Sequence, residues 1–385
     1  MRNAGFIVFA LLTLFSCKGP DKKETIRFAT FNTALYREEH GILKKDLEEG
    51  NDEQIKIIAE IIQRVRPDVL ALQEFDYDPR GKYLEYFQDK YLSKSFNNSE
   101  PITYRYMMAF PSNTGIPTDY DLNNDGKKHT AEDSYGYGQY PGQYAFALLS
   151  KYPLDTAQIK TFQEFLWKDM PGALLPVQGD STSWYSPEEL DIFRLSSKNH
   201  VDVPVTINGH QIHVLMAHPT PPGFDGEENR NGKRNHDEIR LLADYISPEG
   251  GDFLTDDKGR PASLTTNDTF VIMGDMNADP EAGDSYDNAI DQLLLHPRVH
   301  PATATGSLVP SSKGSRELHQ QKPDEGHPAH NTATFGLRVD YVLPSKDLAV
   351  KESAVFWPAA GDSLSYLTRG EEGSDHRLVW VDVEY

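Results

Sequence analysis

The chain has 385 residues, of which 38% are hydrophobic and 25% charged, and its formal net charge is −21. This composition is typical of a globular protein with a large core, and it excludes a disordered chain. A protein that holds nucleic acid by its phosphates needs a basic surface, so we expect no stable nucleic-acid partner. We expect a monomer.

The N-terminus is predicted to be an export signal. Arg2 precedes an apolar run at residues 6–15, which is too short to span a membrane. The run leads into the sequence LFSC, which resembles the lipobox of bacterial lipoproteins. Residues 1–16 would then be a signal peptide, and residues 17–25 the lipidated Cys17 with its tether. The alternative is an ordinary cleaved signal in which the cysteine is incidental.

Lipidation of Cys17 would anchor an exported protein to a membrane of the bacterial cell envelope, at the outer membrane or the cell surface. Cys17 is also the only cysteine of the chain. The mature domain is therefore expected to contain no internal disulfide.

Apolar segments after the tether predict many strands and few helices. Helices are expected from the cap residue Asn51 to the stop at Pro67, and at 235–246. Hairpins mix with helix-linked strands, which favours an α/β (α+β) sandwich of two packed mixed sheets with outer helices. Long polar insertions are expected near 111–142, 160–195 and 298–330. The expected strands are 25–32, 68–74, 104–110, 143–150, 201–207, 210–218, 269–277, 332–344 and 376–385.

Polar side chains recur at the ends of these strands. One carboxylate or histidine in such a position is more often a turn or cap residue than a functional one. The repetition indicates a site, because loops at the ends of buried strands are where sites are assembled. The residues concerned are Asn32, Glu74, His218, Asp275, Asn277, Asp340, Asp375 and His376.

The residue types agree with one chemistry. Glu74 and Asn32 offer the hard oxygen ligands that Mg²⁺ or Mn²⁺ prefers. Asp275 can orient or deprotonate a water, and His218 and His376 can donate hydrogen bonds to phosphate oxygens. The chain contains neither a nucleophile elbow nor a P-loop. These observations predict metal-assisted attack of water on a phosphoester.

Seven segments resemble, in order, the motifs of the endonuclease/exonuclease/phosphatase superfamily, which includes DNase I. They are FATFNTAL, DVLALQEFD, FALLSKYPL, VLMAHPT, VIMGDMNADP, RVDYVLPS and GSDHRLVW, and the resemblance extends over residues 26–385. It implies a single domain with the four-layer α/β sandwich of DNase I, and a phosphoric ester hydrolase (EC 3.1).

The resemblance also implies the metal site. Glu74 would be the main metal ligand, helped by Asn32, and Asp375 would touch the metal or a water. Ala34 stands where some nucleases of the family have an acidic residue. A two-metal scheme is therefore less secure than ligation centred on Glu74.

The remaining motif residues would carry the chemistry. His218 and His376 would contact the scissile phosphate, and Asp340 would be the carboxylate partner of His376, fixing its tautomer and raising its pKa. Asp275 would align the water, and Asn277 would bind the phosphate or that water.

Residues 121–132, DLNNDGKKHTAE, match the calcium-loop pattern D-x-[DN]-x-[DN]-G-x₅-E. We expect a structural Ca²⁺ site, separate from the catalytic metal. The alternative is a surface turn, because Asp, Asn and Gly favour turns. No helical sequence flanks the loop, so Asp133 could replace the last ligand. The predicted ligands are Asp121, Asn123, Asp125, the carbonyl of Lys127, and Glu132.

Two cations and a tyrosine-rich segment could extend the site. Lys198 and Arg234 could grip a non-reacting phosphate, or they could be solvated residues or internal salt-bridge partners. Four tyrosines lie between residues 135 and 144. They could form the wall of a pocket, or they could pack beneath a long loop.

The sequence thus predicts a metal-dependent phosphoesterase. Within that class the substrate could be a small organic phosphate, an extracellular nucleic acid, or a phospholipid cleaved as by a sphingomyelinase. The contrasting hypothesis is a non-catalytic, calcium-dependent surface binding protein.

Overall fold

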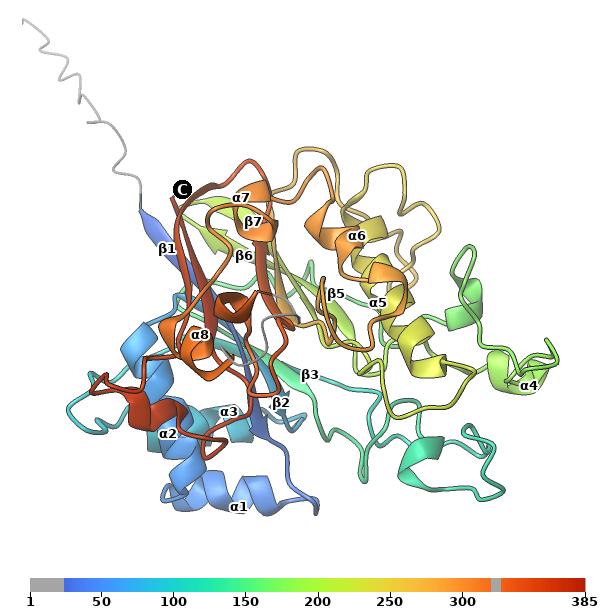
Figure 1. Cartoon of the computed structure of the whole chain (residues 1–385), viewed down its shortest axis with the longest axis horizontal. Helices are drawn as coiled ribbons and strands as arrows, with labels where there is room; N and C mark the ends of the chain where they lie inside the picture. The colour runs from blue at the N-terminus through green and yellow to red at the C-terminus, as the bar shows by residue number, and fades with distance from the viewer. Residues whose placement is uncertain (1–23, 320–326, 385) are drawn as a thin grey trace, which may run out of the picture.

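The computed structural model describes residues 24–319 and 327–384, so the predicted signal peptide and Cys17 lie outside the described residues. Two mixed β-sheets pack together, and helices cover their outer faces (Figure 1). This is the four-layer α/β sandwich expected from the sequence, and the predicted fold class is confirmed. In the described part of the chain, no helix is both long and apolar enough to cross a membrane.

The first sheet has six strands in the order β10-β11-β1-β2-β4-β3. Strands β1 and β2 are parallel, whereas β1 pairs with β11, and β2 with β4, in antiparallel fashion. The carboxyl ends of β1 and β2 therefore meet at one edge. The strands are β1 (Thr25–Leu35), β2 (Val69–Phe75), β3 (Tyr106–Phe110), β4 (Phe146–Ser150), β10 (Ala349–Val355) and β11 (Val379–Glu384).

The second sheet has five strands in the order β5-β6-β7-β8-β9. Here β7 and β8 are parallel, β6 and β7 form the expected hairpin, and β9 runs antiparallel to β8. The strands are β5 (Lys160–Thr161), β6 (His200–Ile207), β7 (His210–Ala217), β8 (Phe270–Asp275) and β9 (Asp340–Pro344).

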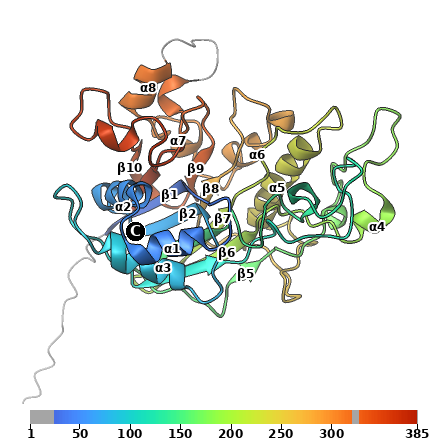
Figure 2. The same ribbon diagram turned by 90° about the horizontal axis from the view of Figure 1, so that it is seen from below.

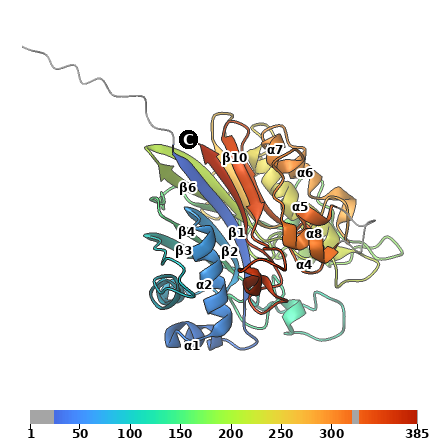
Figure 3. The same ribbon diagram turned by 60° about the vertical axis from the view of Figure 1, so that its left-hand side comes forward.

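The helices form the two outer layers. Figure 3 shows α1 and α2 on one side of the strands and α5 to α7 on the other, and in Figure 2 α4 and its loops lie beyond α5. The helices are α1 (Ile42–Glu49), α2 (Glu53–Val65), α3 (Lys82–Phe87), α4 (Pro187–Leu190), α5 (Arg230–Ile246), α6 (Asp291–Leu294), α7 (Pro301–Ala304) and α8 (Lys313–His319).

Three apolar clusters hold the layers together. One lies between the two sheets and contains Phe28 of β1 and Val214 of β7. Side chains of the opposite face of β1, including Phe31, pack against the α1–α3 layer in a second cluster. The third joins the second sheet to α5 and α6. Each buried large apolar side chain contributes about 1.5–3 kcal/mol, so this packing fixes how the sheets lie against each other.

Helix α2 shows how closely the local sequence predicts where a helix begins and ends. Its N-cap is Asp52, whose side chain accepts a hydrogen bond from the Ile55 amide at 2.9 Å. The predicted cap, Asn51, was one residue early. The helix ends as predicted before Pro67, where Arg66 adopts a left-handed conformation with φ 59°.

Several predicted boundaries were wrong, two of them by five residues or more. The expected helix at 235–246 begins earlier, at Arg230. The expected strand at 332–344 is a strand only from Asp340 onward. Before it, the amides of Thr332 and Ala333 both donate to the carbonyl of Leu337, at 2.8 and 3.2 Å, and so close a turn. Side-chain alternation in this segment therefore does not reflect pairing within a sheet.

Candidate active site

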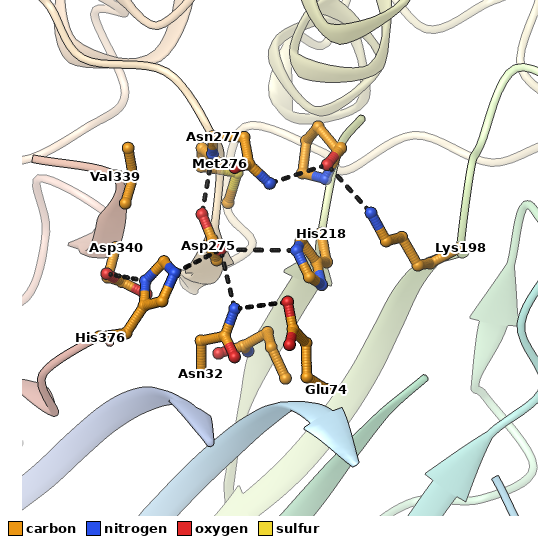
Figure 4. Close-up of polar contacts among 12 residues, drawn as sticks. Asn32, Glu74, Lys198, His218, Asp275, Met276, Asn277, Val339, Asp340 and His376 are labelled. Atoms are coloured by element: carbon orange, nitrogen blue, oxygen red, sulfur yellow. Dashed lines mark hydrogen bonds and ion pairs between the residues drawn. The ribbon is translucent and has the colours of Figure 1, made fainter. Parts of the chain in front are cut away.

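The polar strand ends of both sheets meet at one edge of the sandwich (Figure 4). Asn32 and Glu74 lie at the ends of the parallel strands β1 and β2, and Asp275 ends β8. Asp340, the first residue of β9, is the direct cross-strand partner of Asp275. The sheet topology thus gathers residues that are far apart in the sequence.

Asn32 links the two sheets across this edge. Its Nδ2 donates to Asp275 Oδ2 at 3.0 Å and to Glu74 Oε1 at 3.1 Å. Glu74 adopts a left-handed backbone conformation with φ 56°, which is uncommon for a residue that is not glycine. Such strain at the end of a strand is typical of a residue whose side-chain direction serves a site.

Close packing of β7 and β8 brings His218 close to Asp275. A Cβ atom on Gly274 would lie 2.0 Å from the carbonyl oxygen of Ala217, so only glycine fits there. This approach places His218, which follows β7, with its Nε2 3.4 Å from Asp275 Oδ2. The other oxygen of Asp275 accepts a hydrogen bond from the Asn277 amide at 2.9 Å.

His376 is held by Asp340, as the sequence predicted. Its Nδ1 lies 2.9 Å from Asp340 Oδ2, which also accepts a hydrogen bond from the Thr332 hydroxyl at 2.7 Å. Its Nε2 points towards Asp275 Oδ2 at 3.7 Å. Burial opposes a charge on His376, but the carboxylates of Asp340 and Asp275 outweigh it and raise its pKa to about 10. His376 is therefore protonated at neutral pH.

The pKa of His218 is shifted in the opposite direction to that of His376. Burial, together with the positive charges of Lys198 and His376, lowers the pKa of His218 well below its ordinary value. It is neutral at pH 7, and its Nδ1 has no hydrogen-bond partner among the described residues. Two histidines of the same site thus carry different charges because only His376 has a carboxylate on Nδ1.

Lys198 lies beside this group, and its Nζ donates to the Pro219 carbonyl at 3.4 Å (Figure 4). Burial lowers its pKa against the opposing effect of Glu238, Glu74 and Asp275. The structure thus places Lys198 beside the site, and its contact with substrate stays a prediction.

The two carboxylates nearest Asn32 are costly to ionise. Burial raises the pKa of Glu74 to about 7, against the hydrogen bond from Asn32, and the charges of Asp275 and Asp375 contribute to the rise. Burial likewise raises the pKa of Asp275 to about 6. The charge of protonated His376 offsets this effect only in part, and a bound cation would stabilise both carboxylates further.

Two groupings could hold a metal. Within residues 24–319 and 327–384, one set of His, Cys, Asp and Glu has its ligand atoms within 4.8 Å of one another, namely Asp275, Asp340 and His376. However, His376 donates through Nδ1 to Asp340 and is protonated, so it has no lone pair for a metal. Glu74 with Asn32 is the better site, because Glu74 is only half-buried and, among the described residues, its carboxylate accepts a hydrogen bond from Asn32 alone.

Arg234 lies close by but points elsewhere. It is buried, and its guanidinium donates to the carbonyls of Leu195, Arg194 and Tyr135 at 2.6–2.9 Å. These contacts tie the insertion at 111–142 to the loop before β6. The structure thus gives Arg234 a structural role, and its contact with substrate stays a prediction.

The predicted calcium loop forms a series of side-chain turns. Asp121 accepts hydrogen bonds from the amides of Asp125 and Gly126, and Asp125 accepts one from the Lys127 amide. Asp133 is buried and accepts from the Leu122 and Thr130 amides, so it shapes the loop. No α-helix flanks the loop in the described structure, and calcium binding by Asp121, Asn123, Asp125, Lys127 and Glu132 stays a prediction.

Sequence reasoning missed residues that orient the site from loops. Ser374 Oγ donates to the Asn32 carbonyl at 2.8 Å and accepts from the His376 amide at 3.0 Å, which joins the last motif to β1. Glu238 of α5 accepts from the amides of Ser197 and Thr220, at 2.6 Å each, and fixes the loops before β6 and after β7. Glu238 is a fully buried acid in a helix. Its burial depends on the tertiary fold, so sequence reasoning could not identify it.

The family model for the endonuclease/exonuclease/phosphatase family matches residues 29–376. The chain belongs to this family. Members of the endonuclease/exonuclease/phosphatase family are generally metal-dependent hydrolases of phosphoesters, and the predicted resemblance is confirmed. No curated protein matches the chain by sequence.

The chain is similar to several solved structures, and the one with a TM-score of 0.50 shares its fold. One from Beutenbergia cavernae, described as an endonuclease/exonuclease/phosphatase, has a TM-score of 0.50 and 15% identity, and the match covers 94% of this chain and 71% of that one. A family protein from Leptotrichia buccalis has a TM-score of 0.47 and 16% identity, covering 94% and 100%. Sphingomyelinase C from Streptomyces griseocarneus has a TM-score of 0.46 and 14% identity, covering 93% and 99%.

Proposed function

We propose that the protein is a metal-dependent phosphoesterase that hydrolyses its substrate by attack of an activated water. The observation that carries the proposal is the buried Asp275, which contacts Asn32 and approaches both His218 and His376. A carboxylate with a pKa near 6 is ionised at neutral pH and still basic enough to take part in proton transfer. Protonated His376 beside it supplies the complementary acid.

The donor set fits a divalent metal of the Mg²⁺ type. Glu74 and Asn32 would hold it, with Asp375 as a further oxygen donor, because hard cations prefer carboxylate and amide oxygens and retain waters. A divalent cation beside Glu74 would offset the effect of burial, which raises the pKa of its carboxyl group to about 7. When bound, such a cation withdraws charge from a phosphoryl oxygen and lowers the barrier to attack.

The side chains of the chain itself would divide the remaining work. Asp275 orients the attacking water and accepts its proton through Oδ2, while Asn277 keeps the carboxylate fixed through Oδ1. His376 donates from Nε2 to the phosphate, where negative charge grows in the transition state. Neutral His218 donates a hydrogen bond without adding charge, and Lys198 meets a phosphate oxygen from the opposite side (Figure 4).

We further propose that the domain is exported and tethered to the cell envelope through lipid on Cys17. The LFSC sequence at the end of the apolar run supports this proposal. β1 begins at Thr25, so only seven residues separate Cys17 from the first strand. Such a tether would keep the enzyme close to the membrane surface. Mass spectrometry of the membrane fraction tests for a diacylglyceryl group on Cys17, and a cytosolic protein with an intact N-terminus would contradict the proposal.

A substrate panel tests the catalytic proposal. The purified domain is offered aryl phosphate monoesters and diesters, DNA and sphingomyelin, each with Mg²⁺, Mn²⁺ or Ca²⁺. We expect hydrolysis of at least one ester, and a loss of about 10²–10³-fold in kcat for His376→Asn. His210→Ala, at the exposed first residue of β7, is the matched control and should keep full activity.

Two results would contradict the catalytic proposal. One is an absence of hydrolysis by the wild type under every condition. The other is equal turnover by a folded His376→Asn protein, with folding checked by thermal melting. If the domain binds calcium but hydrolyses nothing, the alternative of a non-catalytic surface binding protein is favoured instead.

A further inference from the structure

Four aromatic rings that the proposed chemistry does not use surround the site. Tyr36 follows β1, Tyr137 and Tyr144 precede β4, and Phe335 lies in the turn before β9. Tyr36, Tyr137 and Phe335 are 39%, 51% and 50% exposed, and among the described residues Phe224 is the one other exposed Phe, Tyr or Trp side chain. Large aromatic side chains kept at a surface beside a polar site are typical of a binding site.

Three of the rings form one continuous surface, here called the tyrosine face: Tyr36, Tyr137 and Tyr144. The ring centroids of Tyr36 and Tyr144 are 4.8 Å apart at 43°, and those of Tyr144 and Tyr137 are 6.5 Å apart at 36°. Burial raises the pKa of both Tyr36 and Tyr144, and the charge of Glu74 raises each further. The tyrosine face therefore adjoins the proposed metal ligand.

Phe335 forms a second wall on the histidine side. Its ring meets His376 edge-on, with centroids 5.5 Å apart at an angle of 78°. A phosphate held between Glu74 and His376 would thus have aromatic surface on both sides. An organic group attached to that phosphate would meet one of these walls.

The tyrosine face is held in place by its neighbours. The hydroxyl of Tyr140 lies 2.6 Å from Asp76 Oδ2 and 2.9 Å from the Arg37 carbonyl, and Gln143 Nε2 donates to the same carbonyl at 2.7 Å. By contrast, no hydroxyl of the tyrosine face hydrogen-bonds to another residue in the described part of the chain. Tyr140 thus anchors the segment, and the tyrosine face is left open to a ligand.

We propose that the organic group of the substrate carries an uncharged planar aromatic ring that stacks on the tyrosine face; this rests on the proposed phosphoesterase function. The face of an aromatic side chain stacks on a planar ring with little dependence on the substituents of that ring. The carboxylates of Asp375 and Glu38 contribute to the field at Tyr36, which disfavours an organic group with further negative charge. A quaternary ammonium could also lie over one ring face, so methyl phosphocholine is the competing substrate.

Matched esters test the inference. Methyl benzyl phosphate and methyl cyclohexylmethyl phosphate differ in one ring, which is planar and aromatic in the first and puckered and saturated in the second. The corresponding monoesters form a second pair. Hydrolysis is followed by phosphorus NMR with Mg²⁺ or Mn²⁺. In whichever pair the wild type hydrolyses, we expect kcat/KM to be about tenfold or more higher for the benzyl ester. A preference of about tenfold corresponds to the free energy of stacking one aromatic ring.

The variants assign the preference to the rings. In Tyr36→Leu the ratio of benzyl to cyclohexylmethyl kcat/KM should fall towards one, and Tyr36→Phe should keep it. Phe335→Leu shows whether the second wall contributes. Tyr152→Leu is the control, because Tyr152 lies near Glu24, at the start of β1 and thus at the opposite end of the sheet. It should keep the wild-type ratio.

Three results would overturn the inference. A wild-type ratio near one would refute aromatic recognition and leave the phosphoesterase intact. A preference for methyl phosphocholine over both esters would favour an ammonium group instead. Hydrolysis of no ester, in these pairs or in the wider substrate panel, would overturn the phosphoesterase and the inference together.

Discussion

Replacing Asp340 by asparagine keeps the shape of the side chain and removes the negative charge next to His376 Nδ1. A histidine with a pKa of about 10 instead of 6.5 is held protonated by interactions worth about 5 kcal/mol. Asp340 at 2.9 Å and Asp275 at 3.7 Å share this effect. Loss of one opposite charge at such a distance lowers a pKa by about 1–3. In Asp340→Asn, the pKa of His376 should therefore fall to roughly 7–9.

The pH dependence of kcat/KM measures this change. For the wild type we expect activity to rise through pH 6, as Asp275 loses its proton, and to fall near pH 10, as His376 loses its own. In Asp340→Asn the alkaline limb should move down by about 1–3 pH units, so the variant loses more activity at pH 9 than at pH 7. Thr332→Val keeps the carboxylate and should move that limb much less. An alkaline limb shared by wild type and Asp340→Asn would refute the reasoning.

Four further predictions follow from single groups. With Mg²⁺ present, Glu74→Gln should abolish activity, because it removes the proposed metal ligand. In chelator above pH 7, the same variant should raise the melting temperature by about 2–4 °C, because ionisation of a half-buried carboxylate with a raised pKa costs roughly 1–2 kcal/mol that a neutral amide does not. Unchanged melting in calorimetry would contradict this. The affinity of the wild type for Mg²⁺ should weaken about tenfold per pH unit below 7, because Glu74 must lose its proton to bind the metal. Titration calorimetry in two buffers should show the release of this proton. Arg234→Met should lower the free energy of unfolding by about 3 kcal/mol in urea denaturation, because three carbonyls lose a charged donor, and a normal midpoint would remove its structural role. Asp121→Ala with Asp125→Ala should abolish a rise in melting temperature caused by Ca²⁺, and a wild type that never responds to Ca²⁺ would refute the calcium loop.

The core of the site was predictable because each residue follows a buried apolar strand. Asn32, Glu74 and Asp275 lie at or near the ends of strands whose pattern is clear in the sequence. Parallel pairing of β1 and β2 places Asn32 beside Glu74, and the packing of the two sheets brings Asp275 to them. The family resemblance supplied what periodicity alone could not. It paired His376 with Asp340, and the structure has that contact at 2.9 Å.

The supporting residues could not be found in this way. Thr332 reaches Asp340 through a turn that looked like a strand, and Ser374 reaches the Asn32 carbonyl across the chain. Their positions depend on loop conformations for which the sequence has no periodic signal. Arg234 shows the converse problem, because a cation in a polar segment looks the same whether it faces substrate or the carbonyls of its own fold.

The hydrogen bond from Asn32 to Asp275 joins side chains of two different sheets. Nothing covalent holds these sheets in alignment at that point. The apolar layer between them does so, although it contains no catalytic group. A small sliding of one sheet over the other would separate acid, base and metal ligand while every strand stayed intact. Turnover should thus be a more sensitive gauge of interior packing than any spectroscopic measure of secondary structure, and enzymes of this architecture can lose function well before they unfold.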